Sequence, residues 1–61
     1  MQKRYFLIGK GNKRTIHVAH TLRQIVGILA VMRLGLVEYS EIDRAKAVAF
    51  FRLGFQVKNW G

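Results

Sequence analysis

Residues 3–19 have the sequence KRYFLIGKGNKRTIHVA, and this stretch decides the fold. Apolar and polar side chains alternate through Lys3–Ile8 and again through Thr15–Ala19, a pattern typical of β-strands. Residues that favour turns lie between the two segments. We therefore expect a β-hairpin in which Gly11 and Asn12 are the two central residues of a primed turn.

This turn fixes the register of the predicted hairpin. The expected pairs are Lys10 with Lys13, Ile8 with Thr15, Leu7 with Ile16, Phe6 with His17 and Tyr5 with Val18. Because successive side chains of a strand point to opposite faces, the register also predicts two faces of the sheet. The first face carries Tyr5, Leu7, Ile16 and Val18. The second face carries Arg4, Phe6, Ile8, Lys10, Lys13, Thr15 and His17. We expect helices to cover one face and the second face to point outward.

Two helical segments are predicted after the hairpin. The first covers residues 22–34, with Thr21 as its N-cap, and is apolar almost all the way round. The second begins at Ser40 and continues to Leu53. Its start has the capping-box pattern, with Asp43 at the position where Glu or Gln is usual.

The remaining segments complete a small α+β domain. Phe55–Trp60 alternates and is predicted to be a third strand, whereas Leu36–Tyr39 is either an extended link or a minor strand. The expected architecture is one domain, residues 1–61, in the order β-β-α-α-β, with an antiparallel sheet and two helices packed on one of its faces. A chain this short buries only about 60% of its unfolded surface. Since it has no cysteine, we expect a homodimer or another partner to add stability.

The two helical segments end alike. Their last residues are Arg33-Leu34-Gly35-Leu36 and Arg52-Leu53-Gly54-Phe55. A glycine in the left-handed conformation followed by an apolar residue is typical of a Schellman cap, and a base there suits the negative end of the helix dipole. We interpret the similarity as helix capping rather than as an internal duplication.

The charge of the chain is strongly positive and unevenly placed. The net charge is +8, and residues 1–37 contain seven Lys or Arg and no acid, whereas residues 38–61 contain four bases and three acids. A positive charge of this size either keeps the protein soluble or attracts phosphate groups, and both interpretations stay open. The N-terminus does not resemble a secretory signal, and the longest apolar stretch, Ile25–Val37, is too short to span a bilayer. A cytoplasmic location is expected.

The residues that carry enzyme chemistry do not form a recognisable set. The loop Gly9–Thr15 has glycines, lysines and a threonine, but it lacks the spacing of a nucleotide-binding P-loop. His17 and His20 are expected on opposite faces of an extended segment, so they are poor ligands for one metal ion. The three acids gather near a predicted helix start, where capping accounts for them. We expect a non-enzymatic protein without a metal ion or cofactor.

Nucleic-acid binding is the first functional hypothesis. Cations neutralise phosphates and aromatic rings stack on bases, so the outward face and its surroundings supply the candidates. The expected phosphate ligands are Arg4, Lys10, Lys13, Arg14, Arg23 and Lys58. The expected stacking residues are Phe6, His17 and Trp60. The pattern does not distinguish DNA from RNA, and the same apolar residues would also suit the seam of a homodimer.

Protein binding is the second hypothesis. Phe50 and Phe51 are adjacent on the second helical segment, so both cannot face one small core. One of them is then an oligomer contact or an anchor for a partner. The protein would be a compact accessory factor or inhibitor, of the size common among virus-encoded modulators, that docks on an acidic surface of a larger host complex. Association with a membrane surface is a third, weaker interpretation, because the first helix lacks a distinct polar face.

Overall fold

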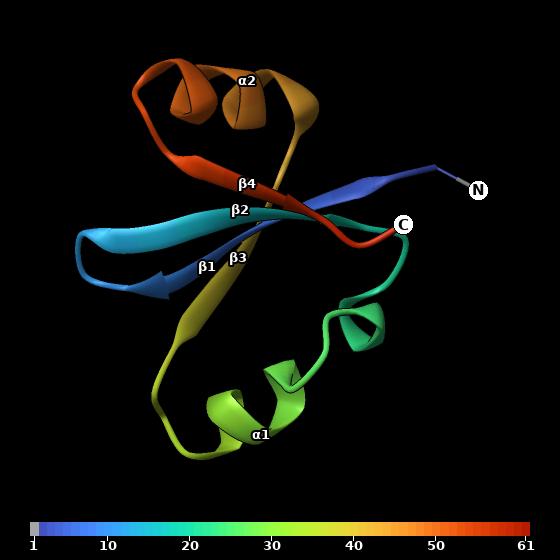
Figure 1. Ribbon diagram of the computed structural model, residues 1–61, viewed down its shortest axis with the longest axis vertical. Helices are drawn as coiled ribbons and strands as arrows, with labels where there is room; N and C mark the ends of the chain where they lie inside the picture. Colours follow the sequence, from blue (N-terminus) through green and yellow to red (C-terminus); the bar gives the residue numbers. More distant parts are fainter. Residues whose placement is uncertain (1) are drawn as a thin grey trace.

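The computed structural model describes residues 2–61 as a small α+β domain with a four-stranded sheet, two α-helices and one 3₁₀-helix (Figure 1). In chain order, the elements are β1 (Arg4–Lys10), β2 (Lys13–Ala19), the 3₁₀-helix η1 (Leu22–Gln24), α1 (Ile28–Arg33), β3 (Glu38–Ile42), α2 (Arg44–Arg52) and β4 (Gln56–Asn59). The strand order is β3-β1-β2-β4. The predicted fold class is confirmed.

The N-terminal hairpin has the predicted register in full. Lys10 pairs with Lys13, Phe6 with His17 and Tyr5 with Val18. Gly11 has a φ of 61°, and among the described residues only glycines have positive φ. Because Asn12 therefore has a negative φ, the turn has the φ signs of type II′ rather than type I′.

The sheet is mixed, so the prediction of a purely antiparallel sheet is wrong for the last strand. β3 pairs antiparallel with β1, and β4 pairs parallel with β2. The residues around Tyr39, expected to be either a link or a minor strand, form part of β3. Because β3 runs in the same direction as β4, the segment β3-α2-β4 is a crossover that carries the chain from one edge of the sheet to the other.

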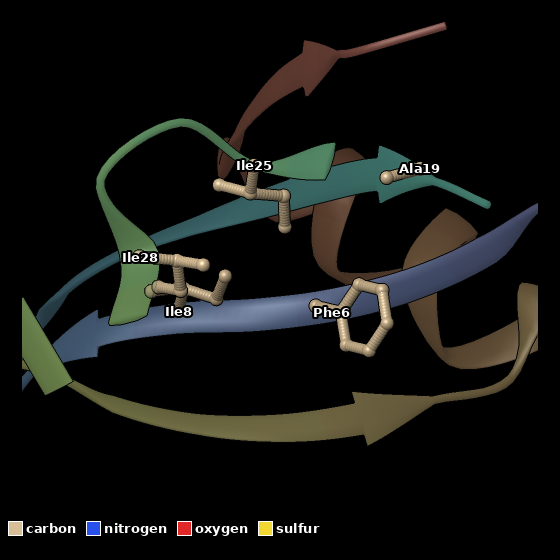
Figure 2. Close-up of a cluster of buried hydrophobic side chains, with 5 residues drawn as sticks. All are labelled: Phe6, Ile8, Ala19, Ile25 and Ile28. Carbon is tan, nitrogen blue, oxygen red and sulfur yellow. The ribbon is translucent and has the colours of Figure 1, made fainter. Parts of the chain in front are cut away.

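The helices cover opposite faces of the sheet, which corrects the prediction that both pack on one face (Figure 1). α2 packs on the face that carries Leu7 and Ile16. η1 and α1 cover the other face, where Ile25 and Ile28 belong to the same buried cluster as Phe6 and Ile8 (Figure 2). The reason is that β1 has apolar residues at successive positions, so both of its faces need cover. The result is a thin three-layer domain of 30 × 30 × 14 Å.

Both predicted helical segments differ from the structure. Gly27, with a φ of 79°, interrupts the first segment, which becomes η1 followed by the short helix α1, and Thr21 makes no side-chain capping bond. The second helix begins at Arg44, four residues later than expected, because Ser40 lies in β3. Its N-cap is Asp43, whose Oδ1 accepts a hydrogen bond from the Lys46 amide at 2.8 Å.

The predicted Schellman caps are present at both helix ends. After α1, the amides of Gly35 and Leu36 donate to the carbonyls of Met32 and Val31. After α2, the amides of Gly54 and Phe55 donate to Phe51 and Phe50 in the same pattern. The second cap includes the expected apolar contact, since the rings of Phe50 and Phe55 have centroids 5.0 Å apart. This cap turns the chain into β4.

Substitution of Gly9 by alanine is expected to destabilise the hairpin severely. Gly9 has a φ of 151°, and a Cβ there would overlap the Lys13 carbonyl. Gly27→Ala is the matched control, because Gly27 also has positive φ but a Cβ there would meet no atom within 4 Å. The control is expected to cost about 1–2 kcal/mol, the usual penalty of a left-handed L-residue. Urea unfolding followed by circular dichroism should show a larger loss for Gly9→Ala, and equal losses would contradict this account.

Candidate nucleic-acid interface

A polar notch lies between the turn of the hairpin and the connection from α2 to β4. Its volume is about 400 Å³. The lining residues are Asn12, Lys13, Arg14, Thr15, Leu53, Gly54, Phe55 and Gln56. The Schellman cap after α2 places Gly54 and Phe55 against the hairpin. The lining therefore combines two cations with amide and hydroxyl groups and contains no carboxylate.

The cations at this end are held close together by the hairpin. Lys10 and Lys13 are directly opposed across the two strands, where like charges repel. Arg14 is fixed by a hydrogen bond of 3.1 Å from its Nε to the Gly11 carbonyl, which leaves its two terminal amino groups for other partners. Arg14 also lines a second hollow beside Phe50. An anion at this end would reduce the repulsion and bind several donors at once.

Phe6 lies in the core, and its burial is incompatible with the predicted stacking role. Its exposed fraction is 1%, because the segment from Ile25 to Ile28 covers this face of the sheet (Figure 2). Ile8 is buried for the same reason. The aromatic outward face that the hairpin alternation predicted is thus the floor of a packed layer.

Arg4 is engaged in an ion pair. Its Nε and Nη2 donate to the two carboxylate oxygens of Glu41 at 2.9 and 2.7 Å, and its guanidinium lies over the Phe6 ring. The hydrogen bond from Arg4 holds the pKa of Glu41 below its usual value, and the same bond raises the pKa of Arg4. Arg4 would have to leave this carboxylate before it could bind a phosphate.

His17 and Trp60 form a hydrogen-bonded pair. The indole Nε1 donates to His17 Nδ1 at 2.9 Å, and the two rings are nearly parallel, with centroids 6.1 Å apart. The short bond and the long centroid distance mean that the rings meet edge to edge. Since Nδ1 accepts, the imidazole proton lies on Nε2. The Lys58 ammonium lies 4.4 Å from the Trp60 ring centroid, so a stacking base would first have to displace it.

Gln24 holds this pair in place, and no sequence motif marks it for that role. Its Nε2 donates to the Trp60 carbonyl at 3.1 Å, and its Oε1 accepts from the His20 amide at 2.8 Å. The Trp60 amide in turn donates to the Val18 carbonyl. These bonds tie the end of β4 to η1 and leave Trp60 only partly exposed.

The predicted phosphate ligands do not form one continuous track. Lys10, Lys13 and Arg14 gather at the turn of the hairpin, whereas Arg23 lies on η1 at the opposite end of β2 (Figure 1). Lys58 lies on β4 over Trp60. The notch also contains hydrogen-bonding side chains that the sequence pattern does not indicate, namely Asn12, Thr15 and Gln56. Only the tertiary contact between the hairpin and the start of β4 brings them together.

The two adjacent phenylalanines have different surroundings. Phe50 packs against Phe55 and the cluster around Leu7 and Ile16, so it belongs to the core. Phe51 has an exposed fraction of 61%. The expectation that both cannot be core residues is confirmed.

Comparisons of the chain with protein-family models, with curated proteins and with solved structures found no match. No helix within residues 2–61 has the length and apolar character needed to cross a membrane. In the same described part of the chain, no three His, Asp or Glu side chains gather in a group that could hold a metal ion.

The pH dependence of stability is expected to report on His17. Burial, and secondarily the charge of Lys58, lowers the pKa of His17 below its usual 6.5. Because the unfolded chain binds this proton more readily, the contribution to stability is present above about pH 6.5 and is lost as the pH falls through the lower, folded-state pKa. The free energy of unfolding should therefore fall as the pH is lowered below about 6.5, and the indole N–H signal of Trp60 should shift as His17 becomes protonated in the folded protein.

Two variants isolate this effect. His17→Asn keeps an acceptor near the position of Nδ1 but cannot titrate, so it should flatten that part of the stability profile. His20→Asn is the matched control and should keep the indole shift. If His17→Asn retained the pH dependence of the parent, the titrating group would lie elsewhere.

Proposed function

We propose that the protein is a non-catalytic nucleic-acid-binding protein that holds the phosphate backbone at the turn of its N-terminal hairpin. The observation that carries the proposal is the notch beside Lys13 and Arg14, where Asn12, Thr15 and Gln56 add hydrogen-bonding groups and, among the described residues, no acid contributes to the lining. Lys10 adds a third cation directly across the hairpin. Several donors at one end of a small domain suit an anionic polymer.

The charges elsewhere support this proposal, because few acids are free to compensate the bases. The chain has eleven Lys or Arg and three acids. Of the acids, Glu41 is paired with Arg4, and Asp43 caps α2. The protein's own carboxylates therefore offset little of the positive potential, and this potential would draw polyanions toward the protein.

The proposed mode of binding is contact with phosphates rather than with base edges. Lys10 and Lys13 would neutralise the backbone, and the terminal amino groups of Arg14 would donate two hydrogen bonds to one phosphate. The groups that read bases are less available, since Phe6 is buried and Lys58 covers Trp60. We therefore propose low sequence preference, with DNA and RNA both as candidate ligands and the cytoplasm as the location.

Fluorescence anisotropy with labelled single-stranded and duplex DNA and RNA tests the proposal. The double variant Lys10→Gln, Lys13→Gln should bind more weakly, and the slope of log K against log salt should decrease by about 2, because each lysine neutralises one phosphate. The matched control is Arg44→Gln, Lys46→Gln, which removes the same charge. Both control residues are exposed near the start of α2, which follows the end of β3 farthest from the hairpin turn. The control should keep the slope of the parent.

Two results would overturn the proposal. The first is no binding to any of the four ligands in about 50 mM salt, where electrostatic association is strong. The second is an equal loss for the two double variants, which would mean that net charge acts without a defined contact at the hairpin turn.

A further inference from the structure

An apolar groove lies beside α2, on the half of the sheet that contains β2 and β4. Its volume is about 280 Å³. Ile16 and Val18 of β2 form its floor, Val48 and Phe51 of α2 form one wall, and Val57 lies on β4. The lining surface is wholly apolar. The groove shares no lining residue with the hairpin notch, so the two are distinct surfaces.

The side chains around this groove are unusually exposed for their type. Phe51 is 61% exposed, and Val48 and Val57 are 42% and 44% exposed. Single exposed apolar residues are normal on protein surfaces, but these three line the same hollow. An occupant that covered them would gain the hydrophobic free energy of an aromatic and two aliphatic side chains.

The backbone of β4 is open along the same groove. β4 pairs only with β2, and the Trp60 amide donates to Val18 of that strand. Because alternate residues of a strand bond to the same neighbour, the N–H and C=O groups of Val57 and Asn59 face the outer edge. The Val57 side chain lies on the α2 face, toward the groove. An added strand would therefore find hydrogen-bonding groups and an apolar pocket at the same place.

The other edge of the sheet lacks this combination. β3 carries Glu38 and Glu41, and Glu41 is paired with Arg4. These carboxylates would repel an acidic segment, whereas Lys58 on β4 would attract one. The edge at β4 therefore suits an acidic segment and the edge at β3 does not.

Every charged side chain within α2 and β4 is positive. Arg44 and Arg52 are one helical turn before and after Val48, so all three lie on one ridge of α2. Lys58 lies on the opposite face of β4, over Trp60. Asp43 is the nearest acid of α2, and its carboxylate caps the helix. A segment added to β4 would meet an apolar groove on one face and cations on both sides.

We infer that β4 and the groove bind an extended segment of a partner protein in which apolar residues alternate with Asp or Glu. The segment adds a fifth strand by pairing with Val57 and Asn59. Its apolar side chains enter the groove against Phe51, and its acidic side chains lie on the other face near Lys58. The period of two along a strand gives this alternation its physical reason.

Charge disfavours a second copy of this chain as the occupant. Two copies that paired through β4 would bring together two Lys58 side chains on one face. On the other face, the ridges with Arg44 and Arg52 would also meet, and each copy carries a net charge of +8. An acidic segment replaces these repulsions with attractions.

The test uses two labelled eight-residue peptides with blocked ends, one of alternating Val and Glu and one of alternating Val and Lys. Anisotropy should show that the acidic peptide binds at least tenfold more tightly than the basic one. With ¹⁵N-labelled protein, the acidic peptide should shift the amide signals of Val57 and Asn59. Equal affinity for the two peptides, or no binding of either at millimolar concentration, would overturn the inference.

Two variants test separately how the groove and the edge of β4 contribute to peptide binding. Phe51→Ser should lower the affinity for the acidic peptide at least tenfold. Leu34→Ser also removes an exposed apolar side chain, but from the opposite layer, so it should not change the affinity. Val57→Pro removes an outward N–H, which an edge strand tolerates, and should abolish binding while the circular dichroism spectrum is kept. Unchanged binding in Val57→Pro would exclude strand addition.

The mass in solution, measured by light scattering, completes the test. A monomer is expected at micromolar concentration. A mass twice that of one chain, which returns to a monomer in Val57→Pro, would show that a second copy occupies the edge and would overturn the inference.

Discussion

The structure depends on the burial of β1 on both of its faces. Phe6, Leu7 and Ile8 are all buried, although their side chains alternate between the two sides of the sheet. A strand of this kind requires one layer above it and one below it. In a chain of 61 residues, each layer is then a single turn or short helix, so the apolar area available to each is small. Side chains such as Phe51 and Leu34 stay exposed because the layers are too small to cover them.

The local parts of the fold can be predicted because local chemistry determines them. The turn at Gly11 fixes every pair of the hairpin, and Gly35 and Gly54 each end a helix with its full set of capping bonds. Local chemistry does not determine the number of layers. Alternation between Lys3 and Ile8 predicts one buried face, but the unbroken apolar run from Phe6 to Ile8 is the stronger indication, because it is typical of a strand covered on both sides.

The candidate site, like the fold, can be predicted from the sequence only in its local parts. The cations at the hairpin turn can be placed from the register alone, since Lys10 and Lys13 face each other across adjacent strands. The neutral part of the notch cannot, because Gln56 reaches it only through the parallel pairing of β4 with β2. The path of the chain through β3 and α2 determines that pairing, and no short motif encodes it. For the same reason, the sequence indicates that Phe50 and Phe51 differ in role, but it does not show which of the two is buried.

The bond between Trp60 and His17 joins residues 43 positions apart, and this separation has a consequence for folding kinetics. The hairpin closes a very short loop and can form early, whereas β4 must wait until the intervening chain is ordered and must bear the entropy of closing a long loop. We therefore expect completion of the sheet to be the last and slowest step. Trp60 is the only tryptophan, so we expect its fluorescence to report mainly on the docking of β4 against the hairpin.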